Sequence, residues 1–346
     1  MSSYTNNSSN ELTSTSATSY TYDYNGNTLT KTDSTGTTNY AWDFENRLTQ
    51  VTLPGTGGPE SYRYDPFGRR IQKVFTQGTN TTTTNFVYDG NSIIEQTDQN
   101  GSVLARYAQD QNLDEPLAES TAGATSFYEQ DGVGSVTSLT SAAGALAQTY
   151  TYDSFGKLTN SSGTLANPFR FTGRDFDSET NLQFSRARYY DPNAGRFVSE
   201  DPLQFGPGDP NFYDYVSNNP ALYTDPTGRT RIYGNWCGPD WTGGLVEEYN
   251  TAHAGMYKPP INRYDTVCMH HDICYFNCRS THPCDKGGRS KCMTTCDEIF
   301  VDEMPQSYVG DILAAGIYWH HFHPDPGPNR RPNNGGGGGG CGCGAK

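Results

Sequence analysis

The first 236 residues of this 346-residue chain contain no cysteine, although the whole chain has nine. All nine lie at or after Cys237, so the composition changes sharply near that residue. Clustered cysteines indicate a disulfide-bonded module that folds in an oxidising compartment. We therefore expect two regions and a protein that is secreted or delivered outside the cell.

The chain also lacks long apolar runs. No segment contains the roughly 18 consecutive apolar residues typical of a membrane-spanning helix. The beginning, MSSYTNNSSN, has neither the basic nor the apolar part of a signal peptide. We expect either an unconventional export route or a fragment of a longer chain.

Basic residues are scarce relative to acidic ones. There are 24 Lys and Arg against 38 Asp and Glu, which gives a formal net charge of -14. An acidic surface repels phosphate backbones and anionic lipid head groups. The balance predicts that nucleic acid is not a partner, and that chemistry on an anionic lipid needs a bridging cation.

Glycine and tyrosine are abundant, and in the first two thirds of the chain an aromatic residue followed by aspartate recurs. The early copies are 20 to 24 residues apart, with Gly-containing turns and alternating apolar residues between them. This pattern predicts stacked β-hairpins, with tyrosines on strand faces and aspartates and glycines in turns. The copies are Tyr22-Asp23, Trp42-Asp43, Tyr64-Asp65, Tyr88-Asp89, Tyr152-Asp153 and Tyr190-Asp191.

These repeats resemble the YD repeats of the rearrangement-hotspot (Rhs) family, and residues 171–228 resemble the Rhs repeat-associated core. The resemblance implies strands wound into a hollow shell around a toxic C-terminal domain, with the core closing the shell. Some members cut themselves just beyond an Asp-Pro-x-Gly element, using aspartates of two Asp-Pro motifs. Here these are Asp201 and Asp225, and Arg229 stands where cleaving members usually have an apolar residue.

The cysteine-rich third contains two segments with helical spacing. In the first, Asn262 is the expected N-cap, and His271, Cys274 and Cys278 share one face of the helix. Asp272 lies about 100° further round, so the two polar groups are expected at the edge of a cleft.

The second segment begins at Ser290 and ends before Pro305. It carries two cysteines four residues apart, as the first helix does, so antiparallel helices allow two disulfides one turn apart. That arrangement brings Asp297 beside the histidine. Other connectivities stay open on sequence grounds. The two pairs would be Cys274–Cys296 and Cys278–Cys292.

Residues 268–275, with the pattern C-x-x-H-D-x-C-Y, resemble the active-site helix of the secreted phospholipases A2. The Cys-Asp pair at 296–297 resembles the one that supplies their second catalytic aspartate. The resemblance implies that His271 is the general base on a water molecule and that Asp297 orients its imidazole. It also implies that Tyr275 hydrogen-bonds Asp297 and that Cys237 pairs with Cys268.

The Trp-Cys-Gly segment at 236–238 resembles the calcium loop of the same family. By that resemblance Ca²⁺ is the cofactor, bound by the Asp272 carboxylate and by backbone carbonyls of Trp236, Gly238 and Asp240. Asp240 stands where the family normally has glycine. Ester hydrolysis needs a base and a cation that stabilises the oxyanion, and histidine with calcium supplies both.

We therefore expect a multidomain protein in which a β-rich scaffold precedes a small α-helical, disulfide-bonded domain. The expected parts are a partial YD-repeat scaffold (1–165), the Rhs core (166–230), a phospholipase A2-like domain (231–325) and a flexible Gly-rich tail (326–346). The expected function is calcium-dependent hydrolysis of the sn-2 ester of glycerophospholipids by an Rhs-type toxin. The expected partners are a phospholipid membrane as substrate and, by resemblance, an immunity protein.

Three alternatives stay open. Asp240 in the loop is compatible with a non-catalytic calcium- or lipid-binding surface or adhesion protein on a YD-repeat scaffold. A purely structural shell fragment is the second. The third is a zinc site, which the absence of a C-x-x-C pair between Cys237 and Cys296 disfavours. The sequence gives no role to Cys284, Cys341 and Cys343.

Overall fold

The structure, a computed structural model, describes residues 3–203 and 211–229 and, beyond them, 241–242, 245–246, 251, 257, 260, 263–281, 291–293 and 295–296. The chain divides into two compact units. The first comprises residues 1–205 and 209–231, and the second 206–208 and 232–346.

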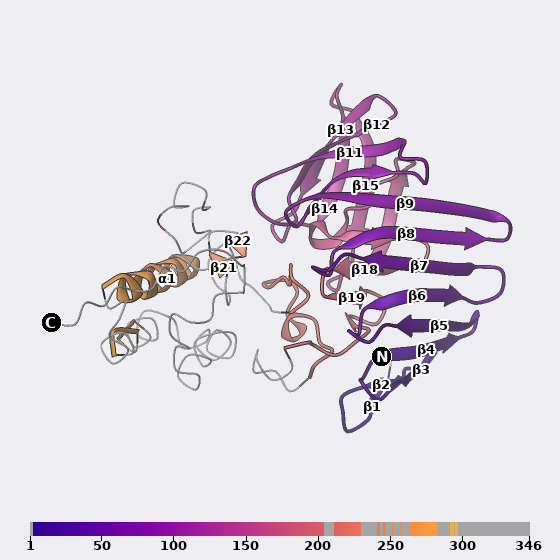
Figure 1. The fold of residues 1–346 in the computed structure, drawn as a ribbon, viewed down its shortest axis with the longest axis horizontal. Helices are drawn as coiled ribbons and strands as arrows, with labels where there is room; N and C mark the ends of the chain where they lie inside the picture. Colours follow the sequence, from indigo (N-terminus) through magenta and orange to yellow (C-terminus); the bar gives the residue numbers. More distant parts are fainter. Residues whose placement is uncertain are drawn as a thin grey trace. The chain divides into compact units, whose positions relative to one another are not determined.

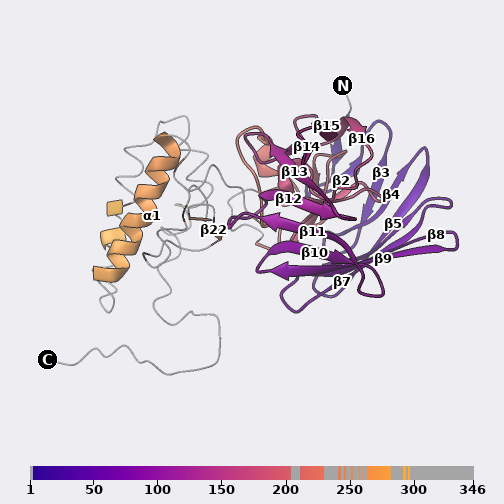
Figure 2. The ribbon, with the colours of Figure 1, turned by 90° about the horizontal axis from the view of Figure 1, so that it is seen from above.

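The first unit is built on a 16-stranded antiparallel sheet in which each strand pairs with its neighbours in sequence (Figure 1). Seen from above, this sheet is strongly curved (Figure 2). The prediction of a β-rich scaffold is therefore confirmed. Its strands are β1 (Thr5–Asn6), β2 (Leu12–Ser14), β3 (Ser19–Tyr22), β4 (Thr28–Asp33), β5 (Gly36–Trp42), β6 (Leu48–Leu53), β7 (Gly58–Tyr64), β8 (Arg70–Gln77), β9 (Asn80–Asp89), β10 (Ser92–Thr97), β11 (Val103–Gln109), β12 (Pro116–Thr121), β13 (Ala124–Gln130), β14 (Val136–Ser141), β15 (Leu146–Tyr152) and β16 (Leu158–Gly163).

Aspartates close many of the hairpins in this sheet. The carboxylate of Asp65, for example, accepts the backbone N–H groups of Phe67 and Arg69 at 2.9 and 3.0 Å. Such a side chain accepts hydrogen bonds from backbone N–H groups of the turn that are not paired with a neighbouring strand. The same pattern of bonds to the second and fourth following residues occurs at Asp23, Asp43, Asp98, Asp131 and Asp153.

The aromatic residue before the aspartate ties the hairpins together. The Tyr64 hydroxyl donates to the carbonyl of Leu48, and the Tyr152 hydroxyl donates to that of Val136 at 2.9 Å. Each bond reaches the preceding strand, β6 for Tyr64 and β14 for Tyr152, which lies outside the hairpin that the following aspartate closes. The pairing register shifts immediately before Tyr64 and Tyr152, and this irregularity turns the ring toward the earlier strand.

A second, four-stranded antiparallel sheet packs against one face of the large sheet. Its strands are β17 (Asp175–Asp177), β18 (Leu182–Ser185), β19 (Arg188–Asp191) and β20 (Arg196–Phe197). Buried side chains of β18 and β19, among them Phe184 and Tyr189, share a core cluster with Leu48, Val51 and Tyr62 of the large sheet. The short 3-10 helices Phe171–Gly173 and Val216–Asn218 lie before and after this sheet in the chain.

Buried ion pairs also join the two sheets. The Arg70 guanidinium, which is fully buried on β8, contacts the carboxylates of Asp175 and Asp177 on β17. Lys73 on β8 lies 3.1 Å from Asp177 and 3.1 Å from Glu179. Paired and hydrogen-bonded charges can be buried at tolerable cost, whereas one left alone cannot. The small sheet is therefore held by both apolar and ionic contacts.

In the second unit, helix α1 runs over Arg263–Thr281, and the short strands β21 (Trp241–Thr242) and β22 (Leu245–Val246) form a hairpin. Residues 291–293 and 295–296 are also helical. The predicted N-cap Asn262 lies outside the described residues. Among the described residues, no helix combines the length and apolar character that crossing a membrane requires.

Candidate functional site

Two predicted sites lie partly or wholly on described residues, and the first surrounds Arg188 on β19. Its Nη2 atom lies 2.9 Å from Asp201 Oδ2 and 3.3 Å from Asp225 Oδ2. The Arg188 side chain is 3% exposed and its guanidinium lies over the Phe197 ring, 3.6 Å from the centroid. One cation therefore brings the two predicted aspartates together in a buried setting.

The same groups hold the peptide bond between Gly228 and Arg229. Arg188 Nε donates to the Gly228 carbonyl oxygen, and the Arg229 backbone N–H donates to Asp225 Oδ1 at 3.0 Å. Gly228 has a φ of 69°, and a Cβ added there would lie 2.0 Å from the Ser185 carbonyl oxygen. The carbonyl is thus polarised by a cation while the amide contacts a carboxylate.

Asp201 lies in surroundings that favour its protonated form. Burial raises the pKa of Asp201 to about 6, although Arg188 and the Leu203 backbone N–H act in the opposite direction. A carboxyl with that pKa carries a proton in an appreciable fraction of molecules near neutral pH. Asp201 can therefore serve as a proton donor beside a second carboxylate.

Arg188 was not singled out by the sequence reasoning. In the sequence it stands in the run Arg186-Ala187-Arg188, which passes from the turn after β18 into the first residue of β19. Nothing in that pattern says which arginine is buried. The ion-pair and hydrogen-bond partners of the Arg188 side chain come from residues 13 to 40 positions further along the chain, which only the folded structure brings near.

The second predicted site lies on α1. His271 Nδ1 is 4.0 Å from Asp272 Oδ1, and the two side chains are 12% and 24% exposed. The His271 ring lies against that of Tyr275, with centroids 4.4 Å apart, and Tyr275 is buried. His270, the next residue, is exposed. This local geometry gives a half-buried imidazole with one carboxylate within reach.

Two disulfides hold α1 against the helical residues 291–293 and 295–296. They join Cys274 to Cys296 and Cys278 to Cys292, with Cα atoms 6.0 and 5.7 Å apart. Cys268 is buried and is also disulfide-bonded. The helix that carries His271 is therefore covalently fixed to its neighbour.

Several predicted site residues lie outside the described residues. They are Trp236, Cys237, Gly238, Asp240 and Asp297. Of the predicted calcium ligands only Asp272 can be placed, and its partly exposed carboxylate is the hard oxygen donor that Ca²⁺ prefers. The roles assigned to the other four, and the calcium site itself, stay predictions.

Comparison with known proteins gives a family and several relatives. The Teneurin YD-shell family model matches residues 2–221. The chain is 35% identical over 228 residues to the tRNA nuclease WapA of Bacillus subtilis, covering 63% of this chain and 9% of that one. It is 30% identical over 223 residues to the double-stranded DNA deaminase toxin A of Burkholderia cenocepacia, covering 56% and 16%. It is 33% identical over 197 residues to the probable deoxyribonuclease RhsA of Dickeya dadantii, covering 55% and 13%.

Among solved structures, the TcdB2-TccC3-Cdc42 crystal structure matches with a TM-score of 0.47 and 19% identity. That match covers 66% of this chain and 15% of the other. The curated relatives are likewise much longer proteins, since this chain spans between 9% and 16% of the three just described.

These relatives correct the expected partners. The prediction that nucleic acid is excluded and that a phospholipid membrane is the partner is wrong, because relatives are named as a tRNA nuclease, a DNA deaminase and a deoxyribonuclease. The net charge of -14 misled because it is a sum over the whole chain. Nucleic-acid chemistry needs only a local cationic surface or metal ion, which a net charge does not report.

Proposed function

The chain belongs to the Teneurin YD-shell family of Rhs and YD-repeat proteins, and on that premise we propose that it is the shell and effector segment of a delivered polymorphic toxin. Two observations support this reading. The repeat-bearing sheet and the small sheet packed on it form one unit, and a cysteine-rich unit of different composition follows. Relatives named as toxins or nucleases share this repeat-bearing sequence type. The effector is therefore sought in the second unit.

We propose that the effector is an enzyme that hydrolyses an ester with His271 as its general base. The observation that carries the proposal is the half-buried His271 ring, which lies 4.0 Å from a carboxylate and against a buried tyrosine. The disulfides fix the helix that carries this ring to its neighbour, and fixed placement of a base favours catalysis. The motif at 268–275 specifies the finer proposal, calcium-dependent cleavage of the sn-2 carboxylic ester of glycerophospholipids.

The test uses the full chain under oxidising conditions with calcium or with a chelator. One arm measures fatty-acid release from a dispersed short-chain phosphatidylcholine, and a second measures cleavage of tRNA and duplex DNA. We expect His271→Gln to lower fatty-acid release by about 10²–10⁴-fold, the range for loss of a general base. The exposed neighbour His270 supplies the matched control, since His270→Gln should leave the rate unchanged.

The two assays distinguish an effector that acts on a different substrate from an effector in which His271 has no catalytic role. Nucleic-acid cleavage that requires His271, without fatty-acid release, would keep the toxin and the base but replace the substrate. Full activity of His271→Gln on every substrate would refute the role of this histidine. Activity that survives the chelator would remove calcium from the proposal.

A second function, self-cleavage between Gly228 and Arg229, has its own support. Arg188 polarises the Gly228 carbonyl, and two carboxylates flank the same guanidinium. Water activated by one carboxylate attacks that carbonyl while the other carboxyl gives a proton to the leaving nitrogen, yielding a new carboxylate and a new amine. The second unit would then be released as a separate chain.

Intact mass spectrometry of the purified full chain tests this cleavage. We expect a fragment that begins at Arg229, and its loss in Asp201→Asn and in Asp225→Asn. Asp98→Asn is the control, because Asp98 accepts backbone N–H groups in an exposed turn far from Arg188 in the sequence, and asparagine can do the same. A fragment ending elsewhere, or cleavage that both site variants retain, would contradict the proposal.

The pH profile adds a readout that simple loss of folding does not give. Since the pKa of Asp201 is raised to about 6, its protonated form is lost as pH rises through that value. If Asp201 is the acid, the cleavage rate falls above about pH 6 and levels off below it. A rate that rises over the same range would assign the acid to another group.

A further inference from the structure

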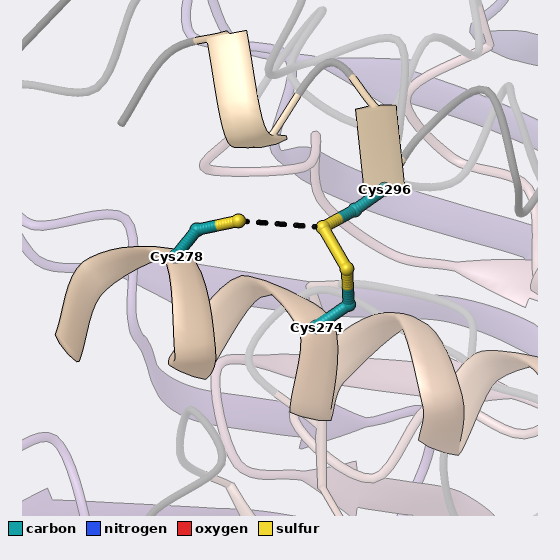
Figure 3. A group of neighbouring side chains, drawn as sticks. All are labelled: Cys274, Cys278 and Cys296. Atoms are coloured by element: carbon teal, nitrogen blue, oxygen red, sulfur yellow. Dashed lines mark hydrogen bonds between the residues drawn. A yellow bond between two sulfur atoms is a disulfide. The ribbon is translucent and has the colours of Figure 1, made fainter. Parts of the chain in front are cut away.

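Two disulfides, and so four cysteine sulfurs, join α1 to the second helical segment, and three of these sulfurs are drawn in Figure 3. Figure 3 shows the Cys274–Cys296 disulfide with the Cys278 sulfur pointing toward it. The Sγ atoms of Cys278 and Cys296, which belong to different disulfides, are 3.5 Å apart. The sulfurs of Cys274, Cys278 and Cys296 all lie within 4.8 Å of one another. The two disulfides are therefore one cluster.

We propose that reduction turns this cluster into a tetrathiolate site for one soft divalent cation of the zinc class. A thiol reductant of the glutathione type supplies two electrons and two protons to each disulfide and is itself oxidised to a disulfide. The four thiols then bind the cation as thiolates and release four protons, with no further electron transfer. The same sulfurs thus hold the helices together in both states.

The distances fit such a cation. Zinc binds thiolates at about 2.3 Å in a tetrahedron, which places neighbouring sulfurs about 3.8 Å apart. The Cys278 and Cys296 sulfurs are 3.5 Å apart, slightly closer than the sulfurs of such a tetrahedron. The three sulfurs of the group lie within 4.8 Å of one another, so this upper bound is somewhat longer than the tetrahedral separation. The fourth sulfur, that of Cys292, is bonded to Cys278 and lies outside this group of three, so its side chain must rotate toward the cation once the disulfides are open. Each helix presents its cysteines four residues apart on one face, which favours this rearrangement.

The surroundings of the cluster also suit a structural metal. Cys278 and Cys296 are 1% and 2% exposed, and Tyr275 and Met293 pack with them. Burial excludes competing water ligands. A site with four protein sulfurs and no open position is the form that structural zinc takes.

Basic residues adjoin the cluster in sequence. Arg279 follows Cys278 and Lys291 precedes Cys292. Cations near a thiol favour its ionised form, which is the form that binds metal.

The proposal gives the second unit two stable forms. Disulfides persist in an oxidising exterior, whereas thiol reductants open them in a reducing cytosol. A unit held together only by disulfides would lose these cross-links when it enters a reducing cytosol. Metal binding by the same cysteines would replace them. This chemistry does not depend on which reaction His271 performs, so its failure and the failure of the proposed enzyme are distinguishable.

The test compares oxidised and fully reduced full-length chain, without oxygen, on addition of Cd²⁺ as a spectroscopic substitute for Zn²⁺. We expect a sulfur-to-cadmium charge-transfer band that saturates at one metal for each reduced chain, and no band for the oxidised chain. Competition with a chromophoric chelator then gives the Zn²⁺ affinity. Cys278→Ser with Cys296→Ser should weaken it by more than the about 10–100-fold that loss of a hydrogen-bonded neighbour of a metal ligand costs.

The tail cysteines provide the matched control. Cys341→Ser with Cys343→Ser also removes two sulfurs and should leave the band and the affinity unchanged. A band lost in this tail variant, or kept in full by the Cys278 and Cys296 variant, would overturn the proposal.

A second measurement does not depend on the folding of any variant. The reduced wild-type chain is alkylated with and without Zn²⁺, and the modified cysteines are mapped by mass spectrometry. We expect Zn²⁺ to protect Cys274, Cys278, Cys292 and Cys296 together. Alkylation of these four at the same rate with and without Zn²⁺ would refute a site there.

Discussion

Glu60, on β7, is fully buried where the small sheet meets the large one. Within the part of the chain that the structure describes, neither of its carboxyl oxygens has a hydrogen-bond partner. Lys73 Nζ lies 3.7 Å from Glu60 Oε1, beyond a normal hydrogen bond. Burial, followed by the charges of Asp177 and Glu179, raises the pKa of Glu60 to about 8, while Lys73 and Arg70 act against this. Glu60 is thus protonated in the folded protein at neutral pH.

The magnitude follows from proton linkage. The unfolded chain releases the Glu60 proton near its ordinary pKa of 4.5, whereas the folded chain keeps it up to about 8. The folded state therefore becomes less stable as pH rises between these values, by about 1.4 kcal/mol for each pH unit. Over the whole interval the loss is on the order of 5 kcal/mol. Glu60→Gln removes the ionisation and keeps the shape of the neutral side chain.

Denaturant unfolding at several pH values between about 4.5 and 9 checks this, with circular dichroism to follow the sheet. We expect wild type and Glu60→Gln to match near pH 4.5, and the variant to gain an advantage that grows to about pH 8 and then stays level. Glu95→Gln is the control, because Glu95 forms a surface pair with Arg106 at 2.7 Å and such pairs contribute about 1 kcal/mol or less. An advantage independent of pH, or a wild type that gains stability as pH rises relative to Glu60→Gln, would refute the reasoning.

Three further substitutions test the scaffold. Arg70→Met should destabilise the fold by about 3–5 kcal/mol at neutral pH, because it removes the guanidinium that pairs with the buried carboxylates of Asp175 and Asp177; a loss below about 1 kcal/mol in denaturant unfolding would contradict this. Gly228→Ala should cost about 1–3 kcal/mol for its positive φ alone, and the clash with the Ser185 carbonyl should also slow self-cleavage, measured by intact mass. Leu139→Ala, at a fully buried core position, should lower the unfolding free energy by about 2–5 kcal/mol, and an unchanged denaturation midpoint would argue against tight packing there.

Much of the scaffold could be predicted from local sequence. The aspartate after Tyr64 carries its own reason for a turn, because its carboxylate reaches the backbone of residues two and four further on. The destination of the Tyr64 hydroxyl could not be predicted, since Leu48 comes within reach only after the pairing register is set. The local sequence therefore predicts the hairpins, but it does not predict the hydrogen bonds that join one hairpin to the next.

The candidate sites divide in the same way. Helical periodicity alone placed His271 and Cys274 on neighbouring parts of one helix. The assembly around Arg188 could not be read from the sequence, because it joins one strand of the small sheet to segments that follow it at different distances along the chain. Contacts of this kind depend on tertiary structure, and no local periodicity encodes them.

The chain order of the large sheet has a consequence for how the protein acquires its structure. Because every strand pairs with its sequence neighbours, the hairpins have low contact order and can zip up one after another as the chain emerges from a ribosome or an export channel. The ion pair between Arg70 and Asp177 spans 107 residues, and the bond from Thr28 to Val198 spans 170. These closures must wait until the small sheet has been made. We expect folding in two kinetic phases. In the fast phase the hairpins of the large sheet form one after another, and in the slower phase the small sheet packs against the strands that formed first.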